Sequence, residues 1–353
     1  MASKTAGISL YDSTFTLHRL SPLYCPESST FLADASLQIH ARRFGGSLKG
    51  DVLRGIRVER NMADEAAKAG PFKQCRWSMV GGREEQLAEG LGESQDNAWN
   101  AAAQDVRGIQ VEMEYEKTTY VALMLQNGDS RPDPPNAKIY LPLLLTRMPT
   151  SLREILLDYL ATTFDTRAEV MRLSNGFISG ALDNYLQTIS NSGSWHLQKV
   201  VKDVHLTLGF KAPIAPSLRS LDITIKREDV LQFLKRGERS RKSRDPGSQD
   251  RRKRKRDDKM EANGPFIIAL SDYIREHLAV DISHEAVFLS KVSCGAFVLG
   301  REGKARIQSP MALIESADQD EGDASSMPEA MTGLLKSLLL EAEGNFAALV
   351  NTT

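Results

Sequence analysis

A strongly basic run at residues 235–256, KRGERSRKSRDPGSQDRRKRKR, limits what this chain can fold into. It holds twelve Lys and Arg against three Asp and Glu, a local charge of +9, while the whole chain carries −1. Such a run cannot pack into a core, because its like charges repel one another and stay hydrated. Patterned sequence lies on both sides, so we predict a disordered basic linker over residues 235–262, between an α+β body at 1–234 and a C-terminal strand-and-helix unit at 263–353.

Two basic clusters within this run match a bipartite nuclear-import signal. They lie on either side of a polar spacer that contains Pro246, Gly247 and Ser248. A flexible cationic strand can also pair with nucleic-acid phosphates, and a solvated basic loop without a receptor is a third interpretation. The candidate import residues are Arg241, Lys242, Arg251, Arg252, Lys253, Arg254, Lys255 and Arg256.

The rest of the composition is that of an ordinary globular chain. It has 353 residues, of which 41% are hydrophobic and 26% charged. Cys25, Cys75 and Cys294 are far apart and odd in number, which favours a reducing compartment over a disulfide framework. No apolar run approaches the ~20 residues that a membrane-spanning helix needs, and the N-terminus lacks the apolar part of a secretory signal. We therefore expect a soluble nuclear protein with no membrane contact.

Alternating apolar and polar residues predict strands that pair as hairpins. Residues 74–80 alternate in this way, and residues 109–115 and 119–125 flank a short polar turn. Residues 81–104, rich in Gly, Ala, Asn and Glu, predict a loop. Further strands are expected at residues 55–60, 138–145, 204–210, 218–225, 286–292, 296–299 and 304–308.

Helical periodicity predicts about six helices. The first spans residues 29–44 and is ended by Gly45 and Gly46. The second starts with an S-x-x-E capping box formed by Ser151 and Glu154. The others are expected over 165–189, from about 230 into the basic run, over 265–278, and from Pro328 onward. Strands and helices come in groups without strict alternation, which indicates an α+β fold with a largely antiparallel sheet.

The sequence contains no recognisable catalytic or metal-binding motif. Residues 300–304, GREGK, have the wrong glycine spacing for a phosphate loop, and Ala305 replaces the required Ser or Thr. A tight turn between strands is the better prediction there. The six histidines are scattered and lack further ligands at metal-binding spacings. We therefore expect neither an enzyme nor a cofactor.

A second group of basic residues gathers around the glycines that follow the first predicted helix. Two interpretations stay open for it. The cations at the helix end can complement the helix dipole, or the group can face nucleic-acid phosphates, which arginine forks and glycine amides contact well. In the second case the DNA-binding residues are Arg42, Arg43, Lys49, Arg54 and Arg57.

Two N-terminal blocks carry a resemblance to a known family. The first is YDSTFTLHRLSPL at residues 11–23, and the second runs from HARR at 40–43 through KGDVLRGIRV at 49–58; both resemble the fungal branch of the centromere protein L family. The order of later elements is similar over most of the chain, including IYLPLLL at 139–145. The resemblance implies a curved, largely antiparallel sheet with helices packed on one side, in a non-enzymatic scaffold subunit of the inner kinetochore.

The same resemblance implies partners at the centromere. It implies a heterodimer with a centromere protein N-like subunit through C-terminal sheet edges, and contacts with centromere protein C, the H-I-K-M subcomplex, and the centromeric nucleosome and its DNA. An apolar strand edge after Ala286 would need a partner strand to cover it, although simple core strands of a monomer would have the same pattern. The expected partner-binding residues are Val287, Leu289, Phe297, Val298 and Leu299.

A nuclear nucleic-acid-binding protein, whose basic linker makes the main phosphate contacts, is the alternative function. The two functions differ in which part of the chain makes the main binding contacts. Removing residues 241–256 would abolish nucleic-acid binding in the alternative, whereas a scaffold would keep its protein partner.

Overall fold

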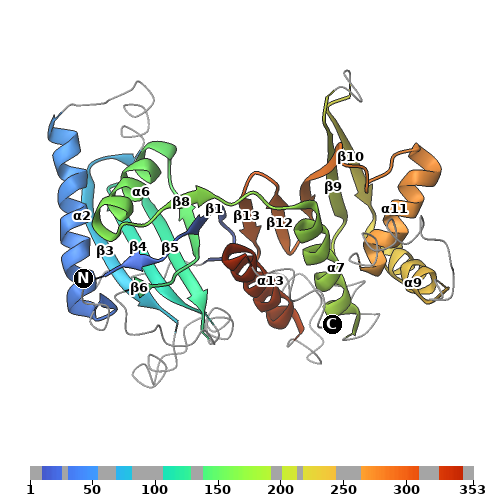
Figure 1. Cartoon of the computed structure of the whole chain (residues 1–353), viewed down its shortest axis with the longest axis horizontal. Coiled ribbons are helices and arrows are strands. Elements are labelled where there is room, and N and C mark those ends of the chain that lie inside the picture. The colour runs from blue at the N-terminus through green and yellow to red at the C-terminus, as the bar shows by residue number, and fades with distance from the viewer. Residues whose placement is uncertain are drawn as a thin grey trace. The chain divides into compact units, whose positions relative to one another are not determined.

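The computed structural model describes residues 10–25, 31–54, 69–81, 106–128, 138–191, 201–212, 218–243, 264–309 and 326–344. Six helices and thirteen strands lie in these ranges (Figure 1). They belong to two compact units. The first is built mainly from Thr14–Met171 with Leu338–Glu343, and the second mainly from Arg172–Ser337 with Tyr11–Ser13. The unit boundary at Met171 lies well before residue 235, so the described start of the basic run, residues 235–243, falls within the second unit.

The first unit contains an antiparallel sheet in which β3, β4, β5, β7 and β1 are neighbours in that order. The predicted hairpin is confirmed as β4 and β5, with Val111 opposite Ala122. The single strand predicted at 138–145 is instead two, because Pro142 has no N–H to give to a ladder. The strands are β1 (Thr14–Leu20), β2 (Leu23–Tyr24), β3 (Phe72–Val80), β4 (Val106–Tyr115), β5 (Thr119–Asn127), β6 (Lys138–Ile139), β7 (Leu143–Arg147) and β8 (Ala168–Val170).

Two helices, α2 (Asp34–Arg54) and α6 (Thr150–Phe164), share the core of this unit. Phe44 of α2, Leu156 of α6 and Trp77 of β3 are all buried in one apolar cluster. The helices therefore pack on the same face of the sheet. Burying each such side chain contributes roughly 2 kcal/mol, which makes this cluster the main support of the unit.

Helix α2 continues through Gly45 and Gly46, so the predicted end of this helix at residue 44 is wrong. A Cβ atom at Gly45 would lie 3.4 Å from the Cβ of Cys75, and Leu48, one turn further on, is buried. Packing on β3 therefore outweighs the helix penalty of about 1 kcal/mol per glycine. The strand expected at 55–60 lies outside the described residues, as does nearly all of the loop expected at 81–104.

The predicted capping box at Ser151 is also wrong. The N-cap residue of α6 is Pro149, two residues before Ser151, and it makes no side-chain cap. The helix ends at Asp165 in the left-handed region, with φ of 48°. Residues after this turn therefore leave the helical path, and β8 pairs with β1 instead of continuing the helix expected over 165–189.

The second unit contains an antiparallel sheet with the order β10, β9, β11, β12, β13. The five predicted strands are confirmed with small shifts of their ends. Asn175 secures an irregularity in β11 between Leu289 and Lys291: its side chain donates to the Val287 carbonyl at 3.2 Å and accepts from the Leu289 N–H at 3.1 Å. The strands are β9 (Val204–Phe210), β10 (Ser220–Ile225), β11 (Val287–Ser293), β12 (Phe297–Gly300) and β13 (Lys304–Ile307).

Helix α9 includes the first part of the basic run, so the predicted linker at 235–262 begins as helix over residues 235–243. The reason is packing. Leu234 and Gly237 are buried, and a Cβ atom at Gly237 would overlap the Pro265 carbonyl oxygen. The helices of this part of the chain are α7 (Asn175–Asn191), α9 (Arg227–Ser243), α11 (Pro265–Leu278) and α13 (Ser326–Glu343). With antiparallel pairing in both units and grouped helices, the predicted α+β class is confirmed.

Asp183 in α7 holds the start of α11. Its Oδ1 atom accepts hydrogen bonds from the backbone N–H groups of Phe266 at 2.9 Å and Ile267 at 3.4 Å. The N-cap residue of α11, Gly264, has no side chain to do this, and a Cβ there would lie 2.4 Å from Asp183 Cγ. Burial raises the pKa of the Asp183 carboxyl to about 7, against the opposing effect of these hydrogen bonds and of Arg241.

Replacing Asp183 by Ala is expected to lower the free energy of unfolding by about 1–3 kcal/mol, because two buried backbone N–H groups lose their acceptor. Urea unfolding followed by circular dichroism measures the change. Asp158→Ala removes an exposed carboxylate from α6 and serves as the matched control. Equal destabilisation by the two substitutions would contradict the capping role of Asp183.

His18 in β1 is buried between the paired strands β7 and β8. It lies opposite Leu144 and Val170, is 1% exposed, and its Nδ1 atom has no hydrogen-bond partner among the described residues. Burial, helped by the nearby charge of Arg153, lowers the pKa of this imidazole from 6.5 to about 4. The folded state therefore holds His18 neutral over a pH range in which an unfolded chain protonates it.

Stability is expected to fall as the pH decreases from about 6.5 towards 4, because in that window the unfolded state binds the proton that folded His18 rejects. The loss from this group is on the order of 2 kcal/mol. Urea unfolding of the unmodified chain and of His18→Gln across this range measures it. The two stability curves should converge at acid pH, and parallel curves would show that His18 does not titrate as stated.

Candidate functional site

The five residues predicted to bind a partner lie in interior strands of the second unit, so the expected edge after Ala286 is corrected. Strand β11 pairs with both β9 and β12, and β12 pairs with both β11 and β13. The side chains at four of the positions belong to the core, and Val298 alone is partly exposed. The exposures are 5% for Val287, 2% for Leu289, and 0% for Phe297 and Leu299.

Strand β10 ends the order of strands in the second unit, and among the described strands it pairs with β9 only. Its register with β9 runs without interruption from Ser220 to Ile225, its one charged residue, Asp222, accepts a hydrogen bond from Thr207 of β9 at 2.7 Å, and the strand contains no Lys, Arg or Pro. Proteins usually protect a strand edge with such residues or with a bulge. Leu221 and Ile223, on the side of the core, stay half-buried. This edge is therefore open to pairing with a further strand.

Strand β3 ends the order of strands in the first unit and has the protection that β10 lacks. Its register shifts between Phe72 and Gln74, where Lys73 lies. Lys73 Nζ is 3.7 Å from Glu114, and Arg76 is 3.5 Å from Glu112. The irregularity and the charged side chains disfavour strand addition at this edge.

The structure describes the side chains of only some of the predicted DNA-binding residues. Arg42, Arg43 and Lys49 are exposed on α2 and form no ion pair with a described residue. Arg54 is the last residue of α2, and its side chain lies outside the described part, as does all of Arg57. The helix continues well beyond Arg43, so its C-terminal dipole no longer explains the first two cations, since that effect is limited to the last turn.

Gly46 separates Arg42 from Lys49 along the exposed side of α2. A Cβ atom added at Gly46 would have no heavy atom within 4 Å. No described residue therefore requires glycine here, although glycine weakens a helix by about 1 kcal/mol relative to alanine. The three residues lie one turn apart, and the glycine leaves the backbone between the two cations accessible.

His40, in the same sequence block, does not join this basic surface. Its ring packs among aromatic rings, with centroid distances of 4.9 Å to Phe164 and 5.4 Å to Phe31. Its Nδ1 atom lies 3.1 Å from the Tyr159 hydroxyl. Burial, with a smaller effect of Arg43, lowers the pKa of His40. A neutral packing role therefore follows for this residue.

Most of the predicted import residues lie beyond the described part of the chain. Arg241 is exposed in α9, Lys242 is in the same helix with its side chain outside the described part, and Arg251, Arg252, Lys253, Arg254, Lys255 and Arg256 fall outside it altogether. The import assignment thus remains a prediction from sequence.

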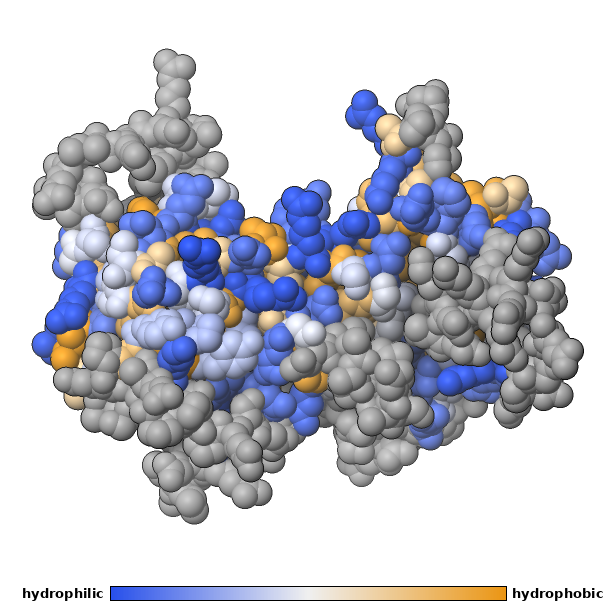
Figure 2. Space-filling model, viewed as in Figure 1, coloured by the Kyte–Doolittle hydropathy of each residue, from blue (hydrophilic) through white to orange (hydrophobic). Residues whose placement is uncertain are grey.

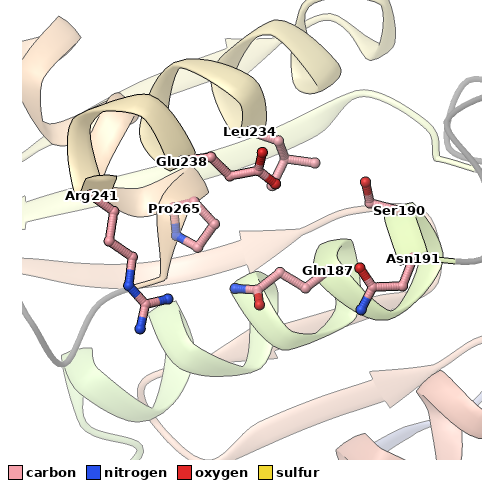
Figure 3. Close-up of a pocket in the computed structure, with 7 residues that line it drawn as sticks. All are labelled: Gln187, Ser190, Asn191, Leu234, Glu238, Arg241 and Pro265. Carbon is pink, nitrogen blue, oxygen red and sulfur yellow. The ribbon is translucent and has the colours of Figure 1, made fainter. Parts of the chain in front are cut away.

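A small cavity of about 220 Å³ lies between α7, α9 and the start of α11. Arg241 extends from α9 towards α7, and Gln187 and Asn191 extend from α7 into the space between the helices (Figure 3). This lining offers hydrogen bonds and one charge of each sign, but no nucleophile beside a base. The lining residues are Gln187, Ser190, Asn191, Leu234, Glu238, Arg241 and Pro265.

The described residues offer no metal centre: among them no three His, Cys, Asp or Glu side chains could hold an ion together. The three cysteines are free. Burial raises the pKa of Cys294 to about 12 and that of Cys25 to about 11, which keeps both thiols protonated at neutral pH. No helix in the described ranges is long and apolar enough to cross a bilayer.

The described candidate features are a strand edge at β10 and exposed basic residues on α2. Among the coloured residues in Figure 2, most are hydrophilic, and the hydrophobic ones lie in small scattered groups. A family model for centromere protein L matches residues 9–343. The chain belongs to this family, a structural kinetochore family, and is therefore a nuclear protein of the centromere. Among curated proteins, none matches the chain.

Replacing Gly46 by Ala is expected to stabilise the first unit by roughly 0.5–1 kcal/mol, because alanine favours the helix and its methyl group meets open space. Thermal unfolding measures the gain. Gly45→Ala is the control, since its methyl group would be in contact with Cys75 and Phe72 and should give a smaller gain or a loss. A destabilised Gly46→Ala chain would show that this glycine has a structural role.

Proposed function

We propose that this protein is a non-enzymatic scaffold subunit of the inner kinetochore. It forms a heterodimer with a centromere protein N-like partner and helps the constitutive centromere-associated network engage centromeric nucleosomes and DNA. The observation that carries the proposal is the unprotected β10 edge in a chain of the centromere protein L family. Membership of the family indicates which complex the protein belongs to, and the β10 edge offers a surface through which it can bind another subunit of that complex.

The physical argument for the heterodimer is one of unsatisfied backbone groups. Along Ser220–Ile225, the side of β10 away from β9 has no strand partner among the described residues. A strand from a partner can satisfy these groups and leave no exposed template for aggregation. Leu221 and Ile223 add half-buried apolar surface beside the edge, and covering it contributes to binding.

The support for a DNA contact comes from the basic surface of α2. Arg42, Arg43 and Lys49 are exposed on one helix and are not neutralised by described carboxylates, and Lys49 Nζ lies 5.9 Å from the centroid of the Phe72 ring. Phosphate oxygens are the ligands that such cations prefer. Centromere protein C and the H-I-K-M subcomplex are further partners that follow from the family, with no surface assigned to them.

One observation favours the alternative, in which the basic run makes the main nucleic-acid contact. Lys235, Arg236 and Arg239 are exposed on α9, so the run begins on an ordered helix that can present its charges. Arg236 is partly engaged, with its guanidinium 3.4 Å from Glu276. The alternative predicts that nucleic-acid binding depends on this run, whereas the heterodimer depends on β10.

Ile223→Lys is expected to weaken or abolish the 1:1 complex with a co-expressed centromere protein N-like subunit, because a charged side chain at a strand edge opposes pairing. Size-exclusion chromatography with light scattering measures the complex. Met79→Lys places the same change at a half-buried, core-facing position of the other edge strand, β3, and should leave the complex intact.

Two results would overturn the proposal. One is an unmodified chain that stays monomeric beside its partner. The other is equal loss of the complex in both variants, with both still folded by circular dichroism, since binding would then not depend on the β10 edge.

A further inference from the structure

The polar side chains around the cavity between α7, α9 and the start of α11 have no partners in the described part of the chain. Gln187, Ser190 and Asn191 line the cavity from α7, and Glu238 and Arg241 line it from α9 (Figure 3). None of the five forms a hydrogen bond or an ion pair with a described residue. Convergent polar groups without partners in a concave site are typical of a binding site.

Asp183 adds a buried carboxyl group where α7 meets the start of α11. It lies one turn before Gln187 on α7, and a Cβ atom at Gly264, the residue before Pro265, would overlap it. Its Oδ1 atom holds the start of α11, but its Oδ2 atom accepts no hydrogen bond from a described residue, and the residue is 1% exposed. Burial raises the pKa of this carboxyl to about 7, although the hydrogen bonds and the charge of Arg241 oppose the rise. Asp183 therefore lacks a close partner of opposite charge.

The size of the cavity and its apolar wall restrict what can enter. Its volume of about 220 Å³ is below the roughly 300–1,000 Å³ of sites for drug-sized molecules, so a single side chain or a similarly narrow group fits. Leu234 and Pro265 are buried and supply an apolar wall. An aliphatic stem can pack along this wall and carry a polar head to the other end, as long basic side chains do.

Charge determines which polar head fits. The carboxyl groups of Asp183 and Glu238 are accompanied by one guanidinium, that of Arg241, which is exposed and can turn to solvent. The side-chain amides of Gln187 and Asn191 offer further acceptors. An anionic head would meet two carboxyl groups, and the described residues hold no group of three metal ligands. A cationic head, in contrast, neutralises a buried carboxylate that is costly to leave unpaired.

We propose that this cavity binds the side chain of a lysine or arginine from another protein. The aliphatic stem lies against Leu234 and Pro265, and the cationic head reaches Asp183 and Glu238. The site goes beyond the proposed function, because it uses neither the β10 edge nor the basic residues of α2. Free polyamines offer the same ammonium and aliphatic groups and are the other source of this chemistry.

Binding to the full chain is measured by saturation-transfer difference NMR, which detects weak ligands. The probe is the peptide acetyl-glycyl-lysyl-glycine amide. A second peptide with norleucine in place of lysine keeps the aliphatic stem and lacks the ammonium group. The lysine peptide should bind about tenfold or more tightly than the norleucine peptide, because only its head group can bond to the carboxylates.

Asp183→Asn is the decisive variant, because its amide oxygen can still accept the hydrogen bonds of α11 while an NH₂ group replaces the unused acceptor. It should weaken binding of the lysine peptide about tenfold or more. Glu238→Gln changes an exposed position and should weaken binding severalfold even if Asp183→Asn proves unstable. Asp158→Asn removes an exposed carboxylate from α6 and is the matched control. Thermal unfolding confirms that each variant folds.

The pH dependence of binding is a readout that a purely structural role of Asp183 would not change. The ionised carboxyl group binds the cation, and its pKa in the free chain is about 7. Affinity for the lysine peptide should therefore rise about tenfold from pH 6 to pH 8, and this rise should be absent in Asp183→Asn. Glu238 and Arg241 are the charged groups that line the cavity from α9, and α7 contains no charged residue besides Asp183.

Equal binding of the two peptides, or equal effects of Asp183→Asn and Asp158→Asn, would overturn the inference. Spermidine that binds through Asp183 while the lysine peptide does not would assign the site to free polyamines and exclude the protein partner. A chain without residues 244–262 that binds the lysine peptide about tenfold more tightly would show that the chain's own basic segment competes for the cavity, which also excludes an external partner. None of these results affects the heterodimer proposed at β10.

Discussion

Pairing of β11 on both of its sides is the constraint on which the rest of the second unit depends. With β9 on one side and β12 on the other, β11 becomes a central strand, and its apolar residues become core. The free edge is thereby moved to β10, three positions away from β12 in the strand order. The same pairing buries Val287, Leu289 and Leu299, so a single set of registers determines both the core and the position of the edge.

Short-range contacts explain which parts of the fold could be predicted from the sequence. The β4–β5 hairpin and helix α11 are predictable because their periodicity is local and their ends carry turn or proline signals. The end of the first helix at Gly45 could not be predicted, because contact with Cys75 in a distant strand decides it. The same holds at Ser151, where the entry through Pro149 replaces the capping box.

The candidate site, like the fold, could be predicted from the sequence only where local patterns determine it. Exposure of Arg42, Arg43 and Lys49 is predictable, since charged residues at helical spacing stay in solvent. The location of the edge is not, because apolar strands such as Val287–Ser293 have the same pattern whether they pair on one side or on two. Sequence alone shows that these apolar residues must be buried. The strand order shows that neighbouring strands of the same chain bury them.

The position of the edge also determines what pairing there demands of the rest of the unit. A strand added beside β10 extends the sheet in its own plane and uses backbone hydrogen bonds, so it leaves the side chains on the two faces of the sheet in place. The intervening β9 separates the edge from the central strand β11. Pairing at β10 therefore requires no rearrangement of the core that β11 and β12 form.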